Sequence, residues 1–359
     1  MKRLLTLLLA IAPAALAAQT EITPFRPGVT ADGICYFLPA TRLHIALEAR
    51  QVTYTPGEYA PYADLYLRIA DVPQKAAQHW TLTSISVTPY GVADPSRAYT
   101  IRLKPKTSAP LVTLTPDGIL LAVNAEATQP APVSQPFTKP LGTNAVDVST
   151  CKTPEMLAAT SPRKAAELAA EEIYDIRDTR TLLTKSQADF MPKDGYQLQL
   201  MLQHLNAQEQ ALMQLFQGTA DTTLHVFTFD VEPSHFDGTP QTLFHFSPEQ
   251  GLLPAASDAA GAYTIAFTDE HTLPAPEPAP AGRNTKKEEE DLRYCVSGTA
   301  QVVIAGPSWQ TLWQQSLPFS QIGHIAHLGG DLFNKKTTTH VLLHSTTGSI
   351  LRLDAAPEN

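Results

Sequence analysis

The hydrophobic period of this chain changes twice along its length, and this change limits the folds open to it. Between residues 161 and 217, apolar residues recur three or four positions apart, which is the spacing of one helix face. On both sides of that region, apolar residues alternate with polar ones or form short runs rich in β-branched and aromatic residues. The sequence therefore predicts an α+β fold, with two antiparallel β-rich, sandwich-like domains and a central antiparallel helical hairpin.

The first β-rich region contains a half-buried strand and a hairpin. Residues 42–50, RLHIALEAR, alternate with a period of two. One face is expected to carry Leu43, Ile45, Leu47 and Ala49, and the other Arg42, His44, Glu48 and Arg50. In PLVTLTPDGILLAVNA, two apolar runs flank Pro116-Asp117-Gly118, which predicts a hairpin turn.

Turn residues and prolines predict the breaks between strands. WTLTSISVTPYGV and AYTIRLKP are expected to be two strands joined by a turn at Gly91, Asp94 and Pro95. Residues 129–140 hold four prolines, which a central strand does not tolerate, so a loop or linker is predicted there. The proline and charge run at residues 273–291 predicts an exposed, mobile loop.

The helical region carries its own start and stop residues. Ser161 followed by Pro162 is typical of an N-cap and first helical position. Pro192 and Gly195 end the first helix, a second helix begins near Tyr196, and Gly218 is a suitable residue just beyond its end. The predicted organisation is a signal peptide at 1–17, a β-rich domain with a short Tyr-rich helix at 18–150, the hairpin at 151–220, and a second β-rich domain at 221–359.

The first 17 residues are typical of a secretory signal peptide. Lys2 and Arg3 precede a short apolar stretch, and Ala15-Leu16-Ala17 fits a cleavage site. The mature chain is therefore expected to be exported, either periplasmic or outer-membrane-associated or extracellular, with no transmembrane segment. Cleavage removes two positive charges, so the formal net charge of −9 becomes −11. Such an acidic chain disfavours nucleic acid as a partner.

The three cysteines, Cys35, Cys151 and Cys295, lie too far apart in sequence for a metal-binding spacing. Their number is odd, so one thiol stays free whatever pairing occurs. Cys35 and Cys295 sit in strand-like apolar runs and are interpreted as buried thiols that act as small hydrophobic residues. Whether any two of the three form a disulfide is left open by the sequence.

Several segments together resemble a known family. They are YTPGEYAPYADLYL, PYGVADPSRAYTI, LTPDGILLAVN and the helical region from AAELAAEEIYDIRDTR to QALMQLFQG, with Tyr-x-Pro-Gly and Asp194-Gly195 as the most specific marks. The chain resembles an uncharacterised secreted family of Bacteroidetes bacteria that is classed as a domain of unknown function. The resemblance implies an exported β–α–β architecture and brings no activity, cofactor or site residue with it.

Catalytic and metal-binding motifs are sparse. HExxH, GxSxG, GxxxxGK[ST] and EF-hand patterns do not occur. His324 and His327 are the best metal candidates, but they lie in a strand-like stretch, where positions three apart face opposite ways. Asp269-Glu270-His271 reads as a polar turn and Glu171-Glu172 as a solvated helix face. No catalytic, cofactor or metal residue is therefore assigned, and no cofactor is expected.

Four tyrosines in fourteen residues form the candidate binding or packing site: Tyr54, Tyr59, Tyr62 and Tyr66. After the turn at Thr55-Pro56-Gly57, the last three fall on one face of a short helix. We expect these rings to pack that helix against the N-terminal β domain, whereas an exposed platform for a sugar is the alternative.

The sequence favours a non-enzymatic, exported cell-envelope protein that acts through protein or glycan contacts. The alternative is a carbohydrate- or peptide-active hydrolase that uses two carboxylates, because such enzymes need no short motif.

Overall fold

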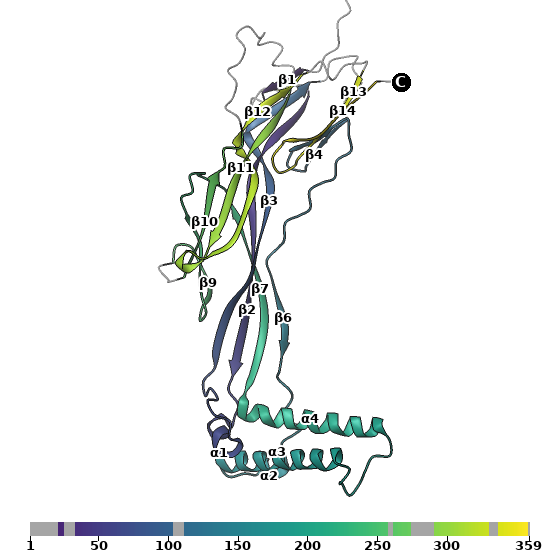
Figure 1. The fold of residues 1–359 in the computed structure, drawn as a ribbon, viewed down its shortest axis with the longest axis vertical. Coiled ribbons are helices and arrows are strands. Elements are labelled where there is room, and N and C mark those ends of the chain that lie inside the picture. Colours follow the sequence, from purple (N-terminus) through teal and green to yellow (C-terminus); the bar gives the residue numbers. More distant parts are fainter. Residues whose placement is uncertain are drawn as a thin grey trace, which may run out of the picture.

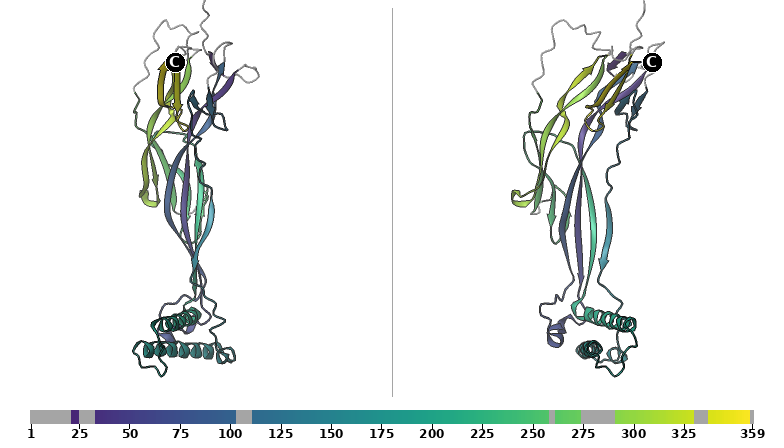
Figure 2. Two further views of the ribbon diagram at one scale, coloured as in Figure 1. Left: turned by 90° about the vertical axis from the view of Figure 1, so that its right-hand side faces the viewer. Right: turned by 45° about the vertical axis from the view of Figure 1, so that its right-hand side comes forward.

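The computed structural model describes residues 21–24, 33–102, 111–257, 261–273, 291–329 and 337–357. The molecule is elongated: a β-rich body narrows into a stalk of strands, and the stalk carries a group of helices at its far end (Figure 1 and Figure 2). The α+β class, with antiparallel sheets and few helices, is confirmed. The expected signal peptide and residues 274–290 of the expected loop lie outside the described residues.

The longest sheet runs from the body into the stalk, and all of its pairs are antiparallel. Its strand order is β1-β3-β2-β7-β6. The strands are β1 (Glu21–Pro24), β2 (Ile34–Thr55), β3 (Ala77–Arg102), β6 (Phe137–Thr143) and β7 (Thr219–Val231). β2 pairs with β3 and with β7 down to the tip of the stalk, so these strands form the backbone of the whole molecule.

Two further sheets complete the body. The five-stranded sheet has the order β12-β11-β10-β8-β9, and the four-stranded sheet has the order β14-β13-β5-β4. Their strands are β4 (Val112–Leu114), β5 (Leu120–Val123), β8 (Gln241–Ser247), β9 (Gly251–Leu253), β10 (Ala262–Asp269), β11 (Leu292–Ala305), β12 (Thr311–Leu328), β13 (Thr337–Leu343) and β14 (Ile350–Pro357). Strands from the regions 18–150 and 221–359 share sheets, since β7 lies between β2 and β6 and β13 pairs with β5.

The predicted alternation of β2 is confirmed where it matters for packing. Its apolar face is fully buried and consists of Leu43, Ile45, Leu47 and Ala49. This face packs against the β12-β11-β10-β8-β9 sheet and the flanking aromatic residues. His44 lies on the opposite face, as the alternation predicts, but that face is covered at this position. Its ring is buried because Nδ1 lies 2.9 Å from an Asp230 carboxylate oxygen and Nε2 lies 3.1 Å from the Ser134 hydroxyl.

Two predicted strand breaks are corrected by the structure. β3 continues through Gly91 and Pro95, and residues 94–97 form a bulge opposite β2. Asp94 accepts hydrogen bonds from Ser96 there, so local polar contacts absorb the extra residues without reversing the chain. Residues 137–140 of the expected linker belong to β6, because an edge strand tolerates a proline such as Pro140.

The hairpin predicted at Pro116-Asp117-Gly118 is confirmed, with β4 and β5 as its strands. Gly118 has φ = 85°, a conformation that glycine adopts without steric cost. All four residues of β5 are buried, so this hairpin supplies part of the body's core.

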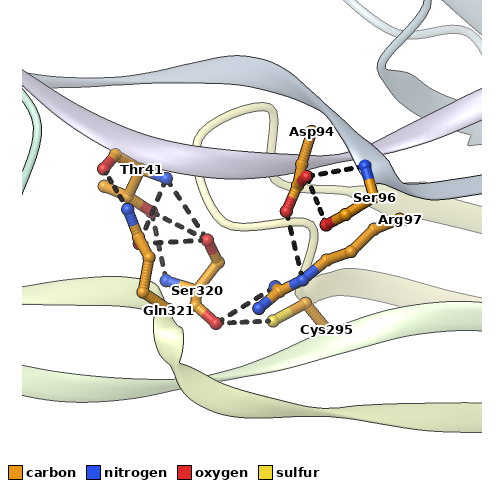
Figure 3. Close-up of polar contacts among 7 residues, drawn as sticks. All are labelled: Thr41, Asp94, Ser96, Arg97, Cys295, Ser320 and Gln321. Carbon is orange, nitrogen blue, oxygen red and sulfur yellow. Dashed lines mark hydrogen bonds and ion pairs between the residues drawn. The ribbon is translucent and has the colours of Figure 1, made fainter.

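A buried polar network joins β2 to β12 where the two large sheets diverge (Figure 3). The Ser320 amide donates to Thr41 Oγ1 over 3.1 Å, and the Thr41 amide donates to Ser320 Oγ over 3.2 Å. Gln321 Nε2 donates to the Thr41 carbonyl over 2.7 Å. Thr41 and Ser320 are fully buried, so these bonds satisfy groups that water does not reach.

The α-helices form one group, which we call the helical tip, and the 3-10 turn η2 (Pro307–Trp309) lies apart from it between β11 and β12. The helical tip consists of the 3-10 turn η1 (Ala60–Tyr62), α1 (Ala63–Leu67), α2 (Pro154–Leu157), α3 (Pro162–Thr184) and α4 (Gly195–Gln217). The antiparallel hairpin of α3 and α4 is confirmed (Figure 1). Ser161 caps α3 as predicted, and Asp194 caps α4 with a 2.8 Å bond from the Gln197 amide.

The three cysteines are free thiols. Cys295 is fully buried in β11, as predicted, and burial raises the pKa of its thiol. Cys35 is half-buried, less than predicted. Among the described residues, no helix combines the length and the apolar character needed to cross a membrane.

Candidate functional site

The helical tip is built from two insertions at the same end of the long sheet. Residues 56–76 connect β2 to its neighbour β3, and residues 144–218 connect β6 to its neighbour β7. The two insertions share one hydrophobic core, in which η1, α1 and α2 contribute to the same cluster as α3 and α4. Because this core is separate from those of the body, the tip is a distinct unit carried on the stalk.

The tyrosine stretch lies in this tip. Tyr59 is buried, and its ring meets the Phe216 ring edge-on at 5.6 Å between centroids. Tyr62 and Tyr66 are half-buried against the same core, and the Tyr66 hydroxyl accepts a hydrogen bond from Arg163. The short helix therefore packs on the hairpin, and the predicted contact with the N-terminal β domain was wrong. The stalk carries the helix away from that domain, so α3 and α4 are the apolar surface within reach.

Tyr54 holds the junction between stalk and tip. Its hydroxyl lies 2.9 Å from the carbonyl oxygens of both Pro73 and Gln217. The backbones are packed tightly beside it, since a Cβ atom on Gly57 would lie 2.4 Å from the Leu215 carbonyl oxygen. A Cβ atom on Gly218, where φ is 77°, would lie 2.3 Å from the Thr55 carbonyl oxygen. Both glycines are required by this close approach.

The surface of the tip exposes large apolar side chains. Among the described residues, fifteen large hydrophobic side chains are exposed, and eight of them belong to the two insertions that build the tip. They are Leu65, Val146, Leu157, Tyr174, Leu182, Phe190, Tyr196 and Leu200. Phe190 and Tyr196, at the turn of the hairpin, are 70% and 75% exposed. Packing within the chain thus leaves the end of the hairpin uncovered.

A groove of about 760 Å³ lies between the tip and the end of the stalk. Residues from α3, α4, the end of β6 and the start of β7 form its walls. The polar side chains are Tyr54, Thr143, Asn144, Arg177, Arg180, Asn206, Glu209, Gln210, Gln214, Gln217 and Thr219. Amide side chains predominate, and the charged ones are two arginines and one glutamate, so the lining carries one net positive charge.

The three charged residues bind one another across the hairpin. Arg177 Nε donates to one Glu209 carboxylate oxygen over 2.6 Å, and Arg180 donates to the other over 2.5 Å. Arg180 also donates to the Asn206 amide oxygen over 2.9 Å. Burial disfavours the charged Glu209 carboxylate, but the bonds from the two arginines outweigh this effect and lower its pKa.

Hydrogen bonds of Asn144 and Gln214 hold one wall of the groove together. The Val146 amide donates to Gln214 Oε1 over 2.9 Å, and Gln214 Nε2 donates to the Asn144 carbonyl. The Ala220 amide donates to Asn144 Oδ1 over 2.6 Å. These bonds fix the loop after β6 against α4 and the first residues of β7, so the groove is formed before any ligand arrives.

The other candidates from the sequence are not brought together. His324 and His327 lie in β12, as expected, and a strand points them to opposite faces. His271 Nδ1 lies 3.1 Å from Asp269 Oδ2 within one exposed turn. Glu171 and Glu172 lie on α3. Among the residues that the structure describes, no group of three or more His, Cys, Asp or Glu side chains could hold a metal ion.

Two more hollows lie on the body. One of about 830 Å³ contains Trp80 and Tyr263, but Gly251 and His225 both pack against the Trp80 ring, which therefore offers little free face for stacking. The other, of about 290 Å³, contains Glu126 and Asp354, and Arg352 binds Asp354. Neither hollow provides an open aromatic platform or two unpaired facing acids.

The sequence carried a pattern for the groove that pointed to ordinary solvated residues. Arg177 and Arg180 are three positions apart, and Asn206, Glu209, Gln210, Met213 and Gln217 recur three or four apart, so each set shares a helix face. Polar residues at this spacing usually face water. Their convergence depends on the hairpin docking against the end of the stalk.

A family model described as a domain of unknown function (DUF4831) matches residues 32–351. Searches among curated proteins and among solved structures give no match.

Proposed function

The chain belongs to the DUF4831 family, and we propose that it is an exported binding module of the cell envelope with the helical tip as its binding end. The export part of the proposal is supported by the signal-like residues 1–17. The binding part is supported by the shape of the molecule, in which a long stalk presents a small helical unit away from the body (Figure 1).

One observation carries the proposal: Phe190 and Tyr196, at the end of the hairpin, are largely exposed. Leu182 and Leu200 are each 44% exposed at the same end. A cluster of exposed large apolar side chains on one end of a protein is typical of a contact surface. A protein partner is favoured, because exposed aromatic and aliphatic residues are common anchors of protein interfaces.

The hydrolase alternative is less well supported by the groove. A two-carboxylate mechanism needs two acids that face each other, one of them protonated. Glu209 is the one acid in the groove lining, and its lowered pKa keeps it charged. A charged carboxylate held by two arginines is a poor general acid.

A photo-crosslinking amino acid placed at residue 190 or 196 tests the binding end in cells. Leu351 on β14 is 58% exposed and is the matched control on the body. We expect discrete crosslinked species from positions 190 and 196, and none from position 351. The proposal fails if the tip positions give no adduct, or if the body position gives the same adducts.

A further inference from the structure

We propose that the groove beside α4 binds a single carboxylate of an acidic peptide segment, with Arg177 and Arg180 as its binding residues. The inference rests on the proposed function, because it gives a chemical class to a partner of the helical tip. It concerns the polar groove and not the apolar end of the hairpin, so the two can be tested separately.

The two guanidinium groups have donors to spare. Each carries five N–H groups. Arg177 uses one for Glu209 and one for the Met213 sulfur, and Arg180 uses one for Glu209 and one for Asn206. Among the described residues, the remaining three N–H groups of each have no acceptor. A carboxylate presents two oxygens in a plane, which matches the forked geometry of a guanidinium group.

The charge of the groove selects for a ligand group with one negative charge. Two arginines and one glutamate leave one positive charge on the lining, in a chain whose overall formal charge is −9. One carboxylate neutralises that charge. A phosphate dianion would leave excess negative charge next to the Glu209 carboxylate, which stays ionised because its pKa is lowered.

The rest of the lining suits a peptide chain around that carboxylate. At about 760 Å³, the groove is much larger than a carboxylate group. The Gln210 and Gln217 side chains line it, and among the described residues neither makes a side-chain hydrogen bond. Each amide offers a donor and an acceptor, the same pair that a peptide unit presents. Since Asn144 and Gln214 already fix the loop after β6 against α4 and β7, little further ordering is needed on binding.

The contacts of Arg177, Arg180 and Glu209 also link α3 to α4, which is a purely structural role. That role needs only the N–H groups that face Glu209. It leaves the arginines 35% exposed and gives no reason for both to line a preformed groove. The two roles differ in what happens when Glu209 loses its charge.

The test uses the full chain labelled with ¹⁵N-arginine and follows the side-chain Nε–Hε resonances of Arg177 and Arg180. The probes are acetyl-Ala-Ala-Glu-Ala-Ala-amide, the same peptide with Gln or phosphoserine in place of Glu, and acetate. We expect the Glu peptide to shift both resonances in a saturable way and the Gln peptide to leave them unchanged. Acetate is expected to bind more weakly than the Glu peptide.

Variants separate binding from structure. Arg180→Gln should lower the affinity for the Glu peptide by roughly tenfold or more, because a charged hydrogen bond is lost. Lys164→Gln removes the same charge from α3 outside the groove and should leave binding unchanged. Glu209→Gln raises the groove charge by one and leaves the arginines one amide oxygen in place of two carboxylate oxygens, so it should increase the affinity for the Glu peptide about threefold or more. Helical circular dichroism checks that each variant keeps the tip folded.

The inference is overturned if the Glu and Gln peptides act alike on the unmodified chain, which needs no variant to decide. Tighter binding of the phosphoserine peptide than of the Glu peptide overturns the assignment of a single charge. Equal binding of acetate and the Glu peptide overturns the peptide part, and unchanged binding in a folded Arg180→Gln variant overturns the role of the arginines. Peptide binding without crosslinks at residues 190 and 196 would leave the groove standing and remove the proposed protein-binding role of the hairpin end.

Discussion

Single residues decide how the two large sheets stay together. Thr41 and Ser320 exchange backbone and hydroxyl hydrogen bonds across 279 positions of sequence (Figure 3). Thr41 Oγ1 also donates to the Thr346 carbonyl over 3.0 Å. Because both side chains are fully buried, each group left without a partner would stay dry. Removing one partner from such a buried pair lowers stability, because the remaining polar group then has neither a hydrogen bond nor water.

Thr41→Val should therefore lower the free energy of unfolding by about 1–3 kcal/mol, since valine keeps the shape and removes the hydroxyl. Thr53→Val on the same strand is the control, because Thr53 is exposed, and its effect should stay within about 0.5 kcal/mol. Chemical denaturation of both variants gives the comparison. Equal effects would mean that the buried network adds nothing to stability.

His225 gives the stalk a pH dependence. Its Nε2 atom lies 2.9 Å from Gln51 Oε1, and its ring stacks on the Phe227 ring with 5.9 Å between centroids. Burial lowers the pKa of His225. A histidine whose pKa is lowered in the folded state favours folding when neutral, so its contribution is complete above the unfolded pKa of about 6.5 and is lost as the pH falls. The melting temperature should drop between pH 7.5 and pH 5.5, and His225→Gln should drop less over that range. An identical drop in both proteins would contradict this assignment.

Among the elements, β6 forms one edge of the long sheet. All seven of its residues are exposed, and it ends the strand order. An exposed edge invites pairing with another chain, and natural edges are protected by proline and bulges. Pro140 lacks an N–H group, and the ladder shifts register between Pro140 and Gly142. Both features interrupt the edge at one place.

Pro140→Val should make the edge continuous and raise self-association of the purified protein. Thr138→Val is the control, because it places a valine on the same strand without restoring an N–H group. Light scattering over a concentration series would show larger species for Pro140→Val alone. If both variants behave like the unmodified protein, the protection of this edge comes from elsewhere.

The individual helices and strands were easier to predict from the sequence than the way they pair and pack with one another. Alternation in residues 42–50 and the cap at Ser161 are local patterns, and local physics sets them. That β7 lies between β2 and β6 depends on contacts across more than 150 positions, for which one sequence holds no period. The groove depends on the same long-range pairing, because it forms only where α4 meets the end of the stalk. Its arginines therefore looked like solvated helix residues.

At the scale of the whole molecule, the helical tip is an addition to a β fold whose strands are paired without it. β2 and β3 are antiparallel neighbours where the first insertion leaves them, with Tyr54 paired to Ala77. β6 and β7 are neighbours at the second, with Thr143 paired to Asp221. The three body clusters contain no residue of η1 or α1 to α4, and the tip cluster contains no strand residue.

Replacing residues 55–76 and 144–220 each by an Asn-Gly turn should leave a folded β body. Both strand pairs already have the geometry that a two-residue hairpin turn closes. The variant should unfold cooperatively, should be shorter by small-angle scattering, and should lose the crosslinking partner of the tip. Replacing only 144–220 is the control, since it strips the cover from Tyr59 and Leu67, which are buried against the hairpin, and should cause aggregation. If the doubly shortened chain does not fold while the singly shortened one does, the tip is part of the body's stability and not a unit added to it.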